Sequence, residues 1–333
     1  MSTSAPARPS PESAAAPARP EQVLRRLEWT VLRRLDGLLH GDYRSLFRGE
    51  GMDLADLREY QYADDVRHID WNVTARLQVP HVREYHEDRE LAAWFVLDLS
   101  GSIDFGSGEA KKLAVAIEFT ALVARLLTRR GNRVGAILYG NEVEAVLPPR
   151  SGRKQVLHIL SRMARRPVAG RGTGTDLRRP LTSALQLVRR RSLVFVVSDF
   201  ISDPGWDQPL AQLARRNEVI GVRLVDPLER ALPDLGLVLM QDAETGEQLY
   251  VDTWDAGFRQ RFAAAAQARE QAIFDALARA GVDALELGTD EDLAATVMRF
   301  AELRKRSTQR SGATAAGARS RFGGARAYAE QVA

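Results

Sequence analysis

The stretch LAAWFVLDLSGS, residues 91–102, decides the fold. Its first seven residues are apolar, which is typical of a strand that is covered on both faces of a sheet. Asp98, Ser100 and Ser102 then follow at alternate positions, and in an extended segment every second side chain points the same way. The sequence therefore predicts a buried strand that ends in three oxygen-bearing side chains on one side.

Similar apolar runs recur downstream, and helical patterns separate most of them. The predicted strands cover residues 91–100, 133–140, 142–149, 192–200, 217–227 and 282–288, the third being ended by its prolines. The predicted helices cover 108–131, 152–166, 175–191 (capped by Thr175 and Asp176), 206–216 and 258–281, with a last one opened by residues 289–292. Parallel strands need helical crossovers, so this order predicts an α/β fold with a doubly wound, mostly parallel sheet. Residues 235–254 predict a hairpin that turns at residues 244–246.

Four segments follow from the changes in composition along the chain. Residues 1–20 and 307–333 are rich in Pro, Ala, Ser, Gly and Arg without periodicity, which predicts disordered tails. Residues 21–90 form an N-terminal helix and a smaller β-rich subdomain, and residues 91–306 form the α/β domain. Apolar residues at helical spacing and several arginines predict a helix over residues 24–38, which packs on the body of the protein or lies on an anionic membrane.

Composition excludes several classes of function. The chain has 333 residues, no cysteine, 45% apolar and 27% charged residues and a formal charge of +3. Disulfides, thiol catalysis and cysteine-held metals are thereby excluded. The balanced charge argues against nucleic acid as a partner, although the basic C-terminal tail leaves contact with nucleic acid or anionic lipid as a third possibility. No apolar run predicts a membrane span or a signal sequence, and we expect a cytoplasmic protein.

Two of the predicted strands end in an aspartate, Asp98 and Asp199. Ligands of doubly wound sheets bind beyond the carboxyl ends of the strands, where these two carboxylates would meet. Bringing two carboxylates together is costly unless a cation neutralises them. Hard oxygen ligands without His or Cys suit Mg²⁺, with Mn²⁺ as the alternative.

Three separated pieces, DLSGS at 98–102, GTGTDL at 172–177 and VVSDF at 196–200, together resemble the metal-ion-dependent adhesion site of von Willebrand factor A domains. The resemblance implies that the coordinating residues are Asp98, Ser100, Ser102, Thr175 and Asp199. Thr175 fits the pattern better than Thr173 because it directly precedes the Asp-Leu pair. The implied fold is of the von Willebrand factor A, Rossmann-like type, and the implied function is binding a partner whose acidic side chain completes the metal's coordination.

The upstream stretch at residues 45–91 contains LREY, DDVRHIDWN, TAR and VREY, and it is similar to the signature of the bacterial domain-of-unknown-function 58 family. This family accompanies MoxR-type AAA+ ATPases. The resemblance implies a non-enzymatic adaptor that works with such an ATPase in chaperone-like assembly or maturation of a client protein. The signature segment itself mixes both charges with aromatic residues, which favours either a recognition surface or an ion-paired subdomain around the A-type domain.

The alternative function is a magnesium-dependent phosphatase-like α/β hydrolase. Such enzymes carry a second aspartate two residues after the first, where this chain has Ser100. A serine nucleophile would need a histidine base, and none of the five histidines follows a predicted strand at this end of the sheet. A phosphate-binding G-x-x-x-x-G-K-[ST] loop is absent from the sequence, so ATP hydrolysis would belong to the partner.

Overall fold

The computed structural model describes residues 20–22, 56–61, 66, 69–84, 92–108, 110–129, 131–140, 142–165, 175–241 and 247–314. The helix predicted over residues 24–38 and most of the tail from residue 307 lie outside these ranges.

A six-stranded sheet forms the centre of the protein, in the order β10-β7-β6-β3-β4-β5. Its parallel strands are β3 (Ala92–Asp98), β4 (Arg133–Tyr139), β6 (Leu193–Ser198), β7 (Glu218–Val225) and β10 (Asp283–Gly288). β3 and β6 are buried along almost their whole length because helices cover both faces of the sheet, which explains their unbroken apolar sequences. The predicted α/β fold with a doubly wound, mostly parallel sheet is confirmed.

One edge strand departs from the sequence prediction. β5 (Val143–Arg150) continues through Pro148 and Pro149, so the prolines do not end it. It pairs with β4 in the antiparallel direction and lies at the edge of the sheet, where a residue without an N–H leaves the ladder on its outer side unaffected. Gly135 of β4 allows the close approach, since a Cβ there would lie 2.9 Å from the carbonyl oxygen of Leu147.

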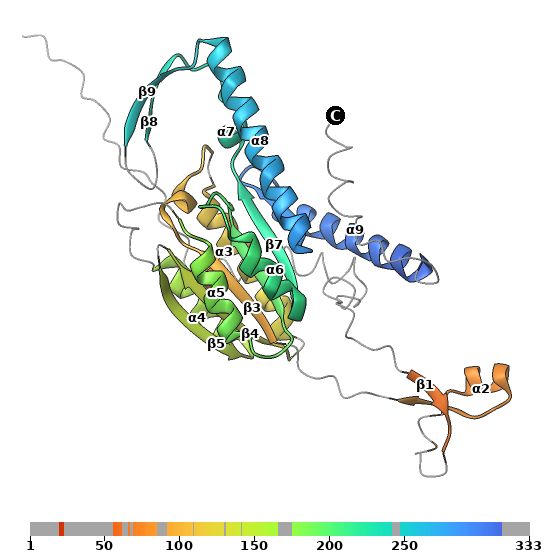
Figure 1. Cartoon of the computed structure of the whole chain (residues 1–333). Coiled ribbons are helices and arrows are strands. Elements are labelled where there is room, and N and C mark those ends of the chain that lie inside the picture. The colour runs from red at the N-terminus through yellow and green to blue at the C-terminus, as the bar shows by residue number, and fades with distance from the viewer. Residues whose placement is uncertain are drawn as a thin grey trace, which may run out of the picture.

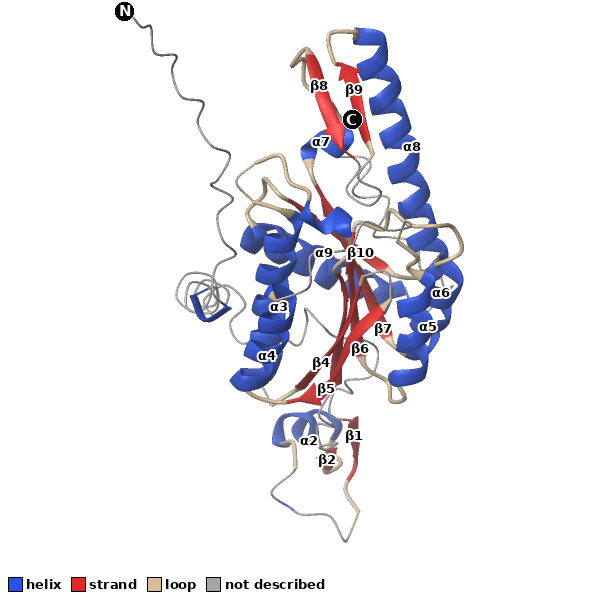
Figure 2. Cartoon of the chain, turned by 90° about the vertical axis from the view of Figure 1, so that its left-hand side faces the viewer, coloured by secondary structure: helices blue, strands red, loops and turns tan. Residues whose placement is uncertain are grey.

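Helices cover the sheet in two layers (Figure 2). On one face lie α3 (Lys112–Arg129), α4 (Arg153–Ala164) and α9 (Leu293–Thr314), whose apolar residues join one buried cluster. On the other face lie α5 (Arg178–Leu187), α6 (Asp207–Arg216) and α8 (Ala256–Ala280), which share a second cluster. The sheet is thus a layer between two apolar cores, which holds the strand ends rigidly in place.

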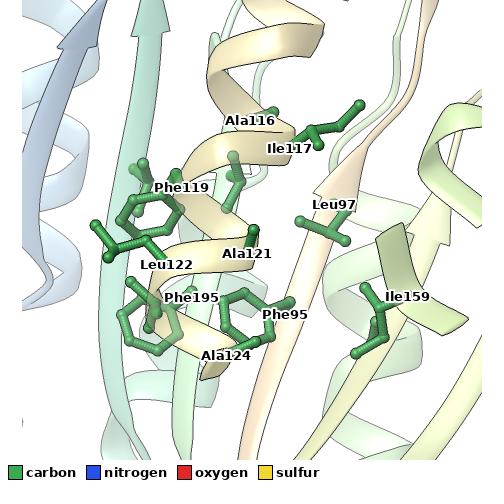
Figure 3. Close-up of a cluster of buried hydrophobic side chains, with 14 of the residues drawn as sticks. Phe95, Leu97, Ala116, Ile117, Phe119, Ala121, Leu122, Ala124, Ile159 and Phe195 are labelled. Carbon is green, nitrogen blue, oxygen red and sulfur yellow. The ribbon is translucent and has the colours of Figure 1, made fainter. Parts of the chain in front are cut away.

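Aromatic rings fill the first core between α3 and the central strands (Figure 3). Phe95 and Phe195, on the adjacent strands β3 and β6, stack with ring centroids 5.1 Å apart. Phe119 of α3 meets Phe195 edge-on at 5.9 Å. Burying each of these rings contributes about 2 kcal/mol to folding, so β3, β6 and α3 form the rigid support of the strand ends.

A hairpin follows the carboxyl end of β7. α7 (Pro227–Arg230) follows β7 directly, and β8 (Leu237–Gln241) then pairs with β9 (Gln248–Asp252) in antiparallel fashion. Figure 1 shows this hairpin standing above the sheet beside the first turns of α8. The predicted hairpin is confirmed, although its turn at residues 244–246 lies outside the described residues.

The N-terminal unit contains β1 (Asp56–Glu59), α2 (Trp71–Leu77) and β2 (His81–Glu84). β1 and β2 pair in antiparallel fashion, and Asp70 caps α2 by accepting hydrogen bonds from the backbone N–H groups of Asn72 and Val73. Figure 1 shows the unit apart from the six-stranded sheet, so these elements do not wrap around it.

The last helix is longer than the sequence predicted. Asp292 caps α9 by accepting from the N–H groups of Ala294 and Ala295, as expected from the opening residues 289–292. The helix then continues to Thr314, beyond residue 306, where the sequence analysis placed the start of a disordered tail. The segment contains no proline to break the run of backbone hydrogen bonds, and the single Gly312 does not end it.

Candidate metal centre

The two predicted strand-end aspartates lie side by side. β3 and β6 are adjacent and parallel, with Leu97 opposite Val197, so Asp98 at the end of β3 and Asp199 just after β6 meet at the carboxyl rim of the sheet. Both are buried, with exposed fractions of 2% and 4%. Parallel pairing of two apolar strands therefore brings together two carboxylates that are 101 positions apart in the chain.

The segment after β3 folds back on itself at the rim. The Ser100 N–H donates to Asp98 Oδ1 at 2.9 Å, and Ser100 then precedes the 3-10 helix η2 (Gly101–Asp104). The hydroxyl oxygens of Ser100 and Ser102 lie 3.1 Å apart. The alternate spacing thus places these two hydroxyls together, beside the carboxylate of Asp98.

The third segment reaches the rim from the start of α5. Thr175 is buried, and its carbonyl oxygen accepts from Ser202 Oγ at 2.8 Å and from the Asp203 N–H at 3.3 Å. Ser202 Oγ in turn accepts from the Leu177 N–H at 2.9 Å. These bonds attach the Thr175 loop to the loop that follows Asp199 at the end of β6. Thr173, the less favoured alternative, lies outside the described residues.

The predicted cap of α5 differs in detail. The helix begins at Arg178 rather than at the Thr175–Asp176 pair, and Leu177 occupies the capping position without a side-chain bond. Asp176 still accepts from the Arg178 N–H at 3.1 Å. Thr175 is therefore a loop residue, and its backbone is held by Ser202 rather than by the helix.

The electrostatics of the rim favour a cation. Burial, followed by the charge of Asp199, raises the pKa of Asp98 to about 6, although hydrogen bonds from Ser198 and Ser100 oppose the shift. One of those bonds runs from Ser198 Oγ to Asp98 Oδ2 at 2.7 Å. Two carboxylates that repel each other in a buried site leave negative charge that a positive ion would neutralise.

A buried lysine, which the sequence analysis did not single out, also lies at this rim. Lys112, in the first turn of α3, is fully buried, and its Nζ lies 3.1 Å from Asp199 Oδ2 and in close contact with Glu229 Oε1. Burial lowers its pKa, but the charges of Asp199 and Glu229 outweigh this and raise it. The available signal was a lysine at the start of an otherwise apolar helix that begins at the same rim. Its two partners, 87 and 117 positions away, could not be read from the sequence.

A further buried carboxylate, that of Asp226, connects the rim to neighbouring loops. Asp226, fully buried after β7, accepts from the Ser107 N–H at 2.8 Å, the Thr289 hydroxyl at 2.6 Å and the Leu228 N–H at 3.0 Å. Burial raises its pKa, but these hydrogen bonds lower it further, so the net pKa lies below the usual value. Asp226 therefore joins the loop after η2, the start of α7 and the turn after β10.

The donor set fits a small hard cation better than a softer one. The five sequence-predicted residues offer two carboxylates and three hydroxyls, which are ligands that Mg²⁺ or Mn²⁺ accepts together with water. Among the described residues no three Asp, Glu or His side chains gather into a metal cluster. The described histidines His81 and His158 lie in β2 and α4, away from the rim, which leaves no histidine base for Ser100 or Ser102 in this part of the structure.

Comparison with known proteins identifies the family. The model described as "Protein of unknown function DUF58" matches residues 56–272. This chain belongs to the DUF58 family. An uncharacterized protein of Mycobacterium tuberculosis is 38% identical over 284 residues, which is 85% of this chain and 89% of the relative, and one of Mycobacterium bovis matches equally well.

Solved structures with a similar chain path include the conserved hypothetical protein BatB from Bacteroides thetaiotaomicron, with 14% identity, a TM-score of 0.41 and coverage of 66% of this chain and 99% of that one. The SpRpn10 VWA domain has 13% identity and a TM-score of 0.36, covering 62% of this chain and 93% of that one. At these values the likeness says nothing about ligands or partners. The DUF58 chain itself has a doubly wound α/β fold, whose sheet has five parallel strands and one antiparallel edge strand.

The structure also bears on membrane insertion. None of the helices that it describes is both long enough and apolar enough to cross a bilayer.

Proposed function

We propose that this DUF58 protein is a non-enzymatic interaction module that binds Mg²⁺ at the carboxyl rim of its sheet and uses the ion to recruit an acidic group of a partner protein. One observation carries the proposal: Asp98 and Asp199 lie together in a buried place, and Lys112, which contacts Asp199, also contacts Glu229. Three carboxylates and one ammonium leave two negative charges, which one divalent ion would balance.

Each residue at the rim has a distinct task in this proposal. Asp98 and Asp199 supply the negative charge, and the hydroxyls of Ser100, Ser102 and Thr175 supply neutral oxygens. The N–H groups of Ser100 and Ile201, which donate to Asp98 and Asp199 at 2.9 Å each, fix the orientation of the two carboxylates. When bound, the ion lowers the cost of desolvating an incoming carboxylate, so that metal and partner bind together.

The identity of the partner comes from the family resemblance alone. We propose a MoxR-type AAA+ ATPase as the partner, with this chain recruiting a client protein for assembly or maturation in the cytoplasm. Neither nucleic acid nor a membrane is part of the proposal. The Mg²⁺-dependent hydrolase is the alternative. This chain lacks two groups that such an enzyme would need: a carboxylate at position 100, where it has Ser100, and a histidine among the described rim residues.

The proposal is tested by measuring Mg²⁺ binding calorimetrically and ATPase binding with and without Mg²⁺. We expect Asp98→Ala and Asp199→Ala to weaken Mg²⁺ binding by at least about a hundredfold and to abolish Mg²⁺-dependent ATPase binding, because each removes a charged ligand. Asp275→Asn is the matched control, since Asp275 is an exposed carboxylate of α8 that bonds only to Gln271 among the described residues.

Three results would contradict the proposal. The first is the absence of Mg²⁺ uptake by the wild-type protein. The second is partner binding that both aspartate variants retain. The third is metal-dependent turnover of a generic phosphate ester by the purified protein, which would favour the hydrolase instead.

A further inference from the structure

The hairpin of β8 and β9 departs from the pattern of a half-buried sheet. In such a hairpin the residues of the outer face are normally polar. Here the pairing places Leu237 opposite Asp252 and Leu239 opposite Tyr250 on the outer face, and Leu235 and Trp254 continue it toward the body. These apolar side chains have exposed fractions of 49–72%. The inner face carries Val238 and Val251, of which Val251 is only 7% exposed, and nearer the turn it carries Leu249, which is 66% exposed.

A group of exposed apolar residues on one small hairpin marks an interaction surface. Outside the hairpin, the exposed large apolar residues of the described chain include Val66, Trp71, Leu77 and Val79 in and around α2, and single residues such as Val146 of β5 and Leu303 of α9. The outer face of β8–β9, which we call the hairpin face, comprises Leu235, Leu237, Leu239, Tyr250 and Trp254.

The segment that carries the hairpin face has an excess of acidic residues, although two of them, Asp234 and Asp255, lie 3.5 Å from Arg259 and Arg261. Residues 232–255 include six acidic residues and neither Lys nor Arg. They are Asp234, Asp242, Glu244, Glu247, Asp252 and Asp255. The next basic residue, Arg259, donates to the backbone carbonyls of Thr253 and Trp254 and lies 3.5 Å from Asp234. An apolar surface with an acidic border is complementary to an apolar surface with a basic border.

The size of the hairpin face limits what it can bind alone. Five exposed side chains make a patch on the order of a few hundred Å², whereas a stable interface buries about 800 Å² on each partner. The hairpin face is therefore one part of a larger surface.

The candidate metal centre lies on the same rim and can supply the remainder. α7 ends at Arg230, shortly before β8, and its Glu229 contacts Lys112, which also contacts Asp199. Figure 2 shows α7 and the hairpin above the end of the sheet where β7 finishes. Since β3, β6 and β7 are parallel, the metal ligands and the hairpin lie at the same end of the sheet.

We propose that the hairpin face is a second contact for the protein that binds at the candidate metal centre, and that this protein presents an apolar patch bordered by Lys or Arg. This inference rests on the proposed function. The acidic border disfavours two other occupants. A second copy of the chain would bring its own acidic border against this one, and an anionic membrane would be repelled.

The test measures binding of the full chain to the purified MoxR-type ATPase from the same genome by biolayer interferometry, with Mg²⁺ present. We expect the double variant Leu237→Ser, Leu239→Ser to weaken binding at least about tenfold, because it removes apolar contacts at the centre of the interface. Mg²⁺ affinity should stay unchanged, because neither residue contacts the rim. Leu303→Ser is the matched control, since Leu303 is a 44% exposed leucine of α9.

Salt dependence tests the predicted chemistry of the partner. Binding should weaken as NaCl is raised, and Glu247→Gln with Asp252→Asn should reduce that dependence, because two charges of the acidic border are lost. Salt-independent binding would contradict the basic border.

The outcomes separate this inference from the proposed function. If the wild type binds the ATPase only with Mg²⁺ and the double leucine variant binds equally well, the inference is wrong and the proposed function stands. If the wild type does not bind at all, both are wrong. A dimer in light scattering that the double leucine variant converts to a monomer would assign the hairpin face to a second copy instead. Flotation of the wild type, but not of the double leucine variant, with anionic vesicles would assign it to a membrane.

Discussion

Two buried ionic clusters lie at the carboxyl end of the sheet, and they differ in their charge balance. In the first, Arg223 of β7 bonds to Glu270 of α8 at 2.5 Å and to Glu286 of β10 at 2.6 Å, and Arg230 of α7 also contacts both acids. Two cations thus meet two anions. In the second, Lys112 alone faces Asp199 and Glu229, with Asp98 nearby.

The difference supports the proposal that the rim cluster, unlike the balanced cluster, binds a cation. In the balanced cluster, the pKa of Glu270 is lowered, because hydrogen bonds and charges from Arg230 and Arg223 outweigh the effect of burial. In the rim cluster, the pKa of Asp98 is raised instead, because burial and the charge of Asp199 outweigh the hydrogen bonds from Ser198 and Ser100. A folded protein that tolerates such an excess of negative charge at a strand end is suited to binding a cation.

The largest expected effect comes from breaking the balanced cluster. Glu286→Gln leaves the buried Arg223 with one charged partner fewer, and we expect it to lower the free energy of unfolding by about 3 kcal/mol. Urea denaturation measures the change. Mg²⁺ affinity should stay the same, and a large loss of Mg²⁺ binding with unchanged stability would contradict the division between the two clusters.

An effect of about the same size is expected from the pH dependence of the rim cluster. The pKa of Asp98 is raised from 3.8 to about 6 in the folded state, so the folded protein binds the proton more tightly than the unfolded chain does. The stability of the metal-free protein should therefore fall as pH rises from about 4 to about 6, by about 3 kcal/mol from this group.

The difference in unfolding free energy between the wild type and Asp98→Asn isolates that contribution, because other acids titrate equally in both proteins. We expect the difference to change across this pH window in Mg²⁺-free buffer and to become flat above it. A difference that does not depend on pH would show that neither burial nor the charge of Asp199 raises the pKa of Asp98 in the folded protein.

The smallest effect sharpens the role of Lys112. Lys112→Met removes the ammonium that competes with a divalent ion for Asp199, so Mg²⁺ affinity should rise by about tenfold, or about 1.4 kcal/mol. Glu229→Gln should lower Mg²⁺ affinity by a similar factor, because the whole charge of Lys112 then acts on Asp199. Calorimetric titration at constant ionic strength measures the Mg²⁺ affinity of both variants. Equal shifts of this affinity in the same direction would contradict a competition between Lys112 and Mg²⁺ for Asp199.

The sequence was sufficient to predict the sheet and the meeting of two strand-end aspartates at its rim. Apolar runs that end in Asp98 and Asp199 belong to adjacent parallel strands, and strand ends are positions that local sequence defines well. The sequence was less informative about the edge strands of the sheet. Pro148 and Pro149 suggested the end of a strand, but only the position of β5 in the sheet shows that prolines are tolerated there.

The parts that the sequence did not predict depend on long-range contacts. Lys112 was one of four lysines without a pattern, and its role became visible once α3 placed it beside Asp199 and Glu229. The hairpin was predicted correctly, but its outer face was not, because alternation alone does not tell which face of β8 packs on the body. Only the buried Val251 fixes that orientation.

The hydrogen bonds of Asp226 matter for the design of truncated versions of this protein. The family match ends at residue 272, yet β10 begins at Asp283 and Thr289 donates to Asp226, which in turn holds Ser107. A shortened version that stops at residue 272 would lose the border strand of the sheet, expose the ladder of β7 and release the loop beside Asp98 from one of its supports. Truncations intended for crystallisation or two-hybrid screening should therefore retain the chain through α9.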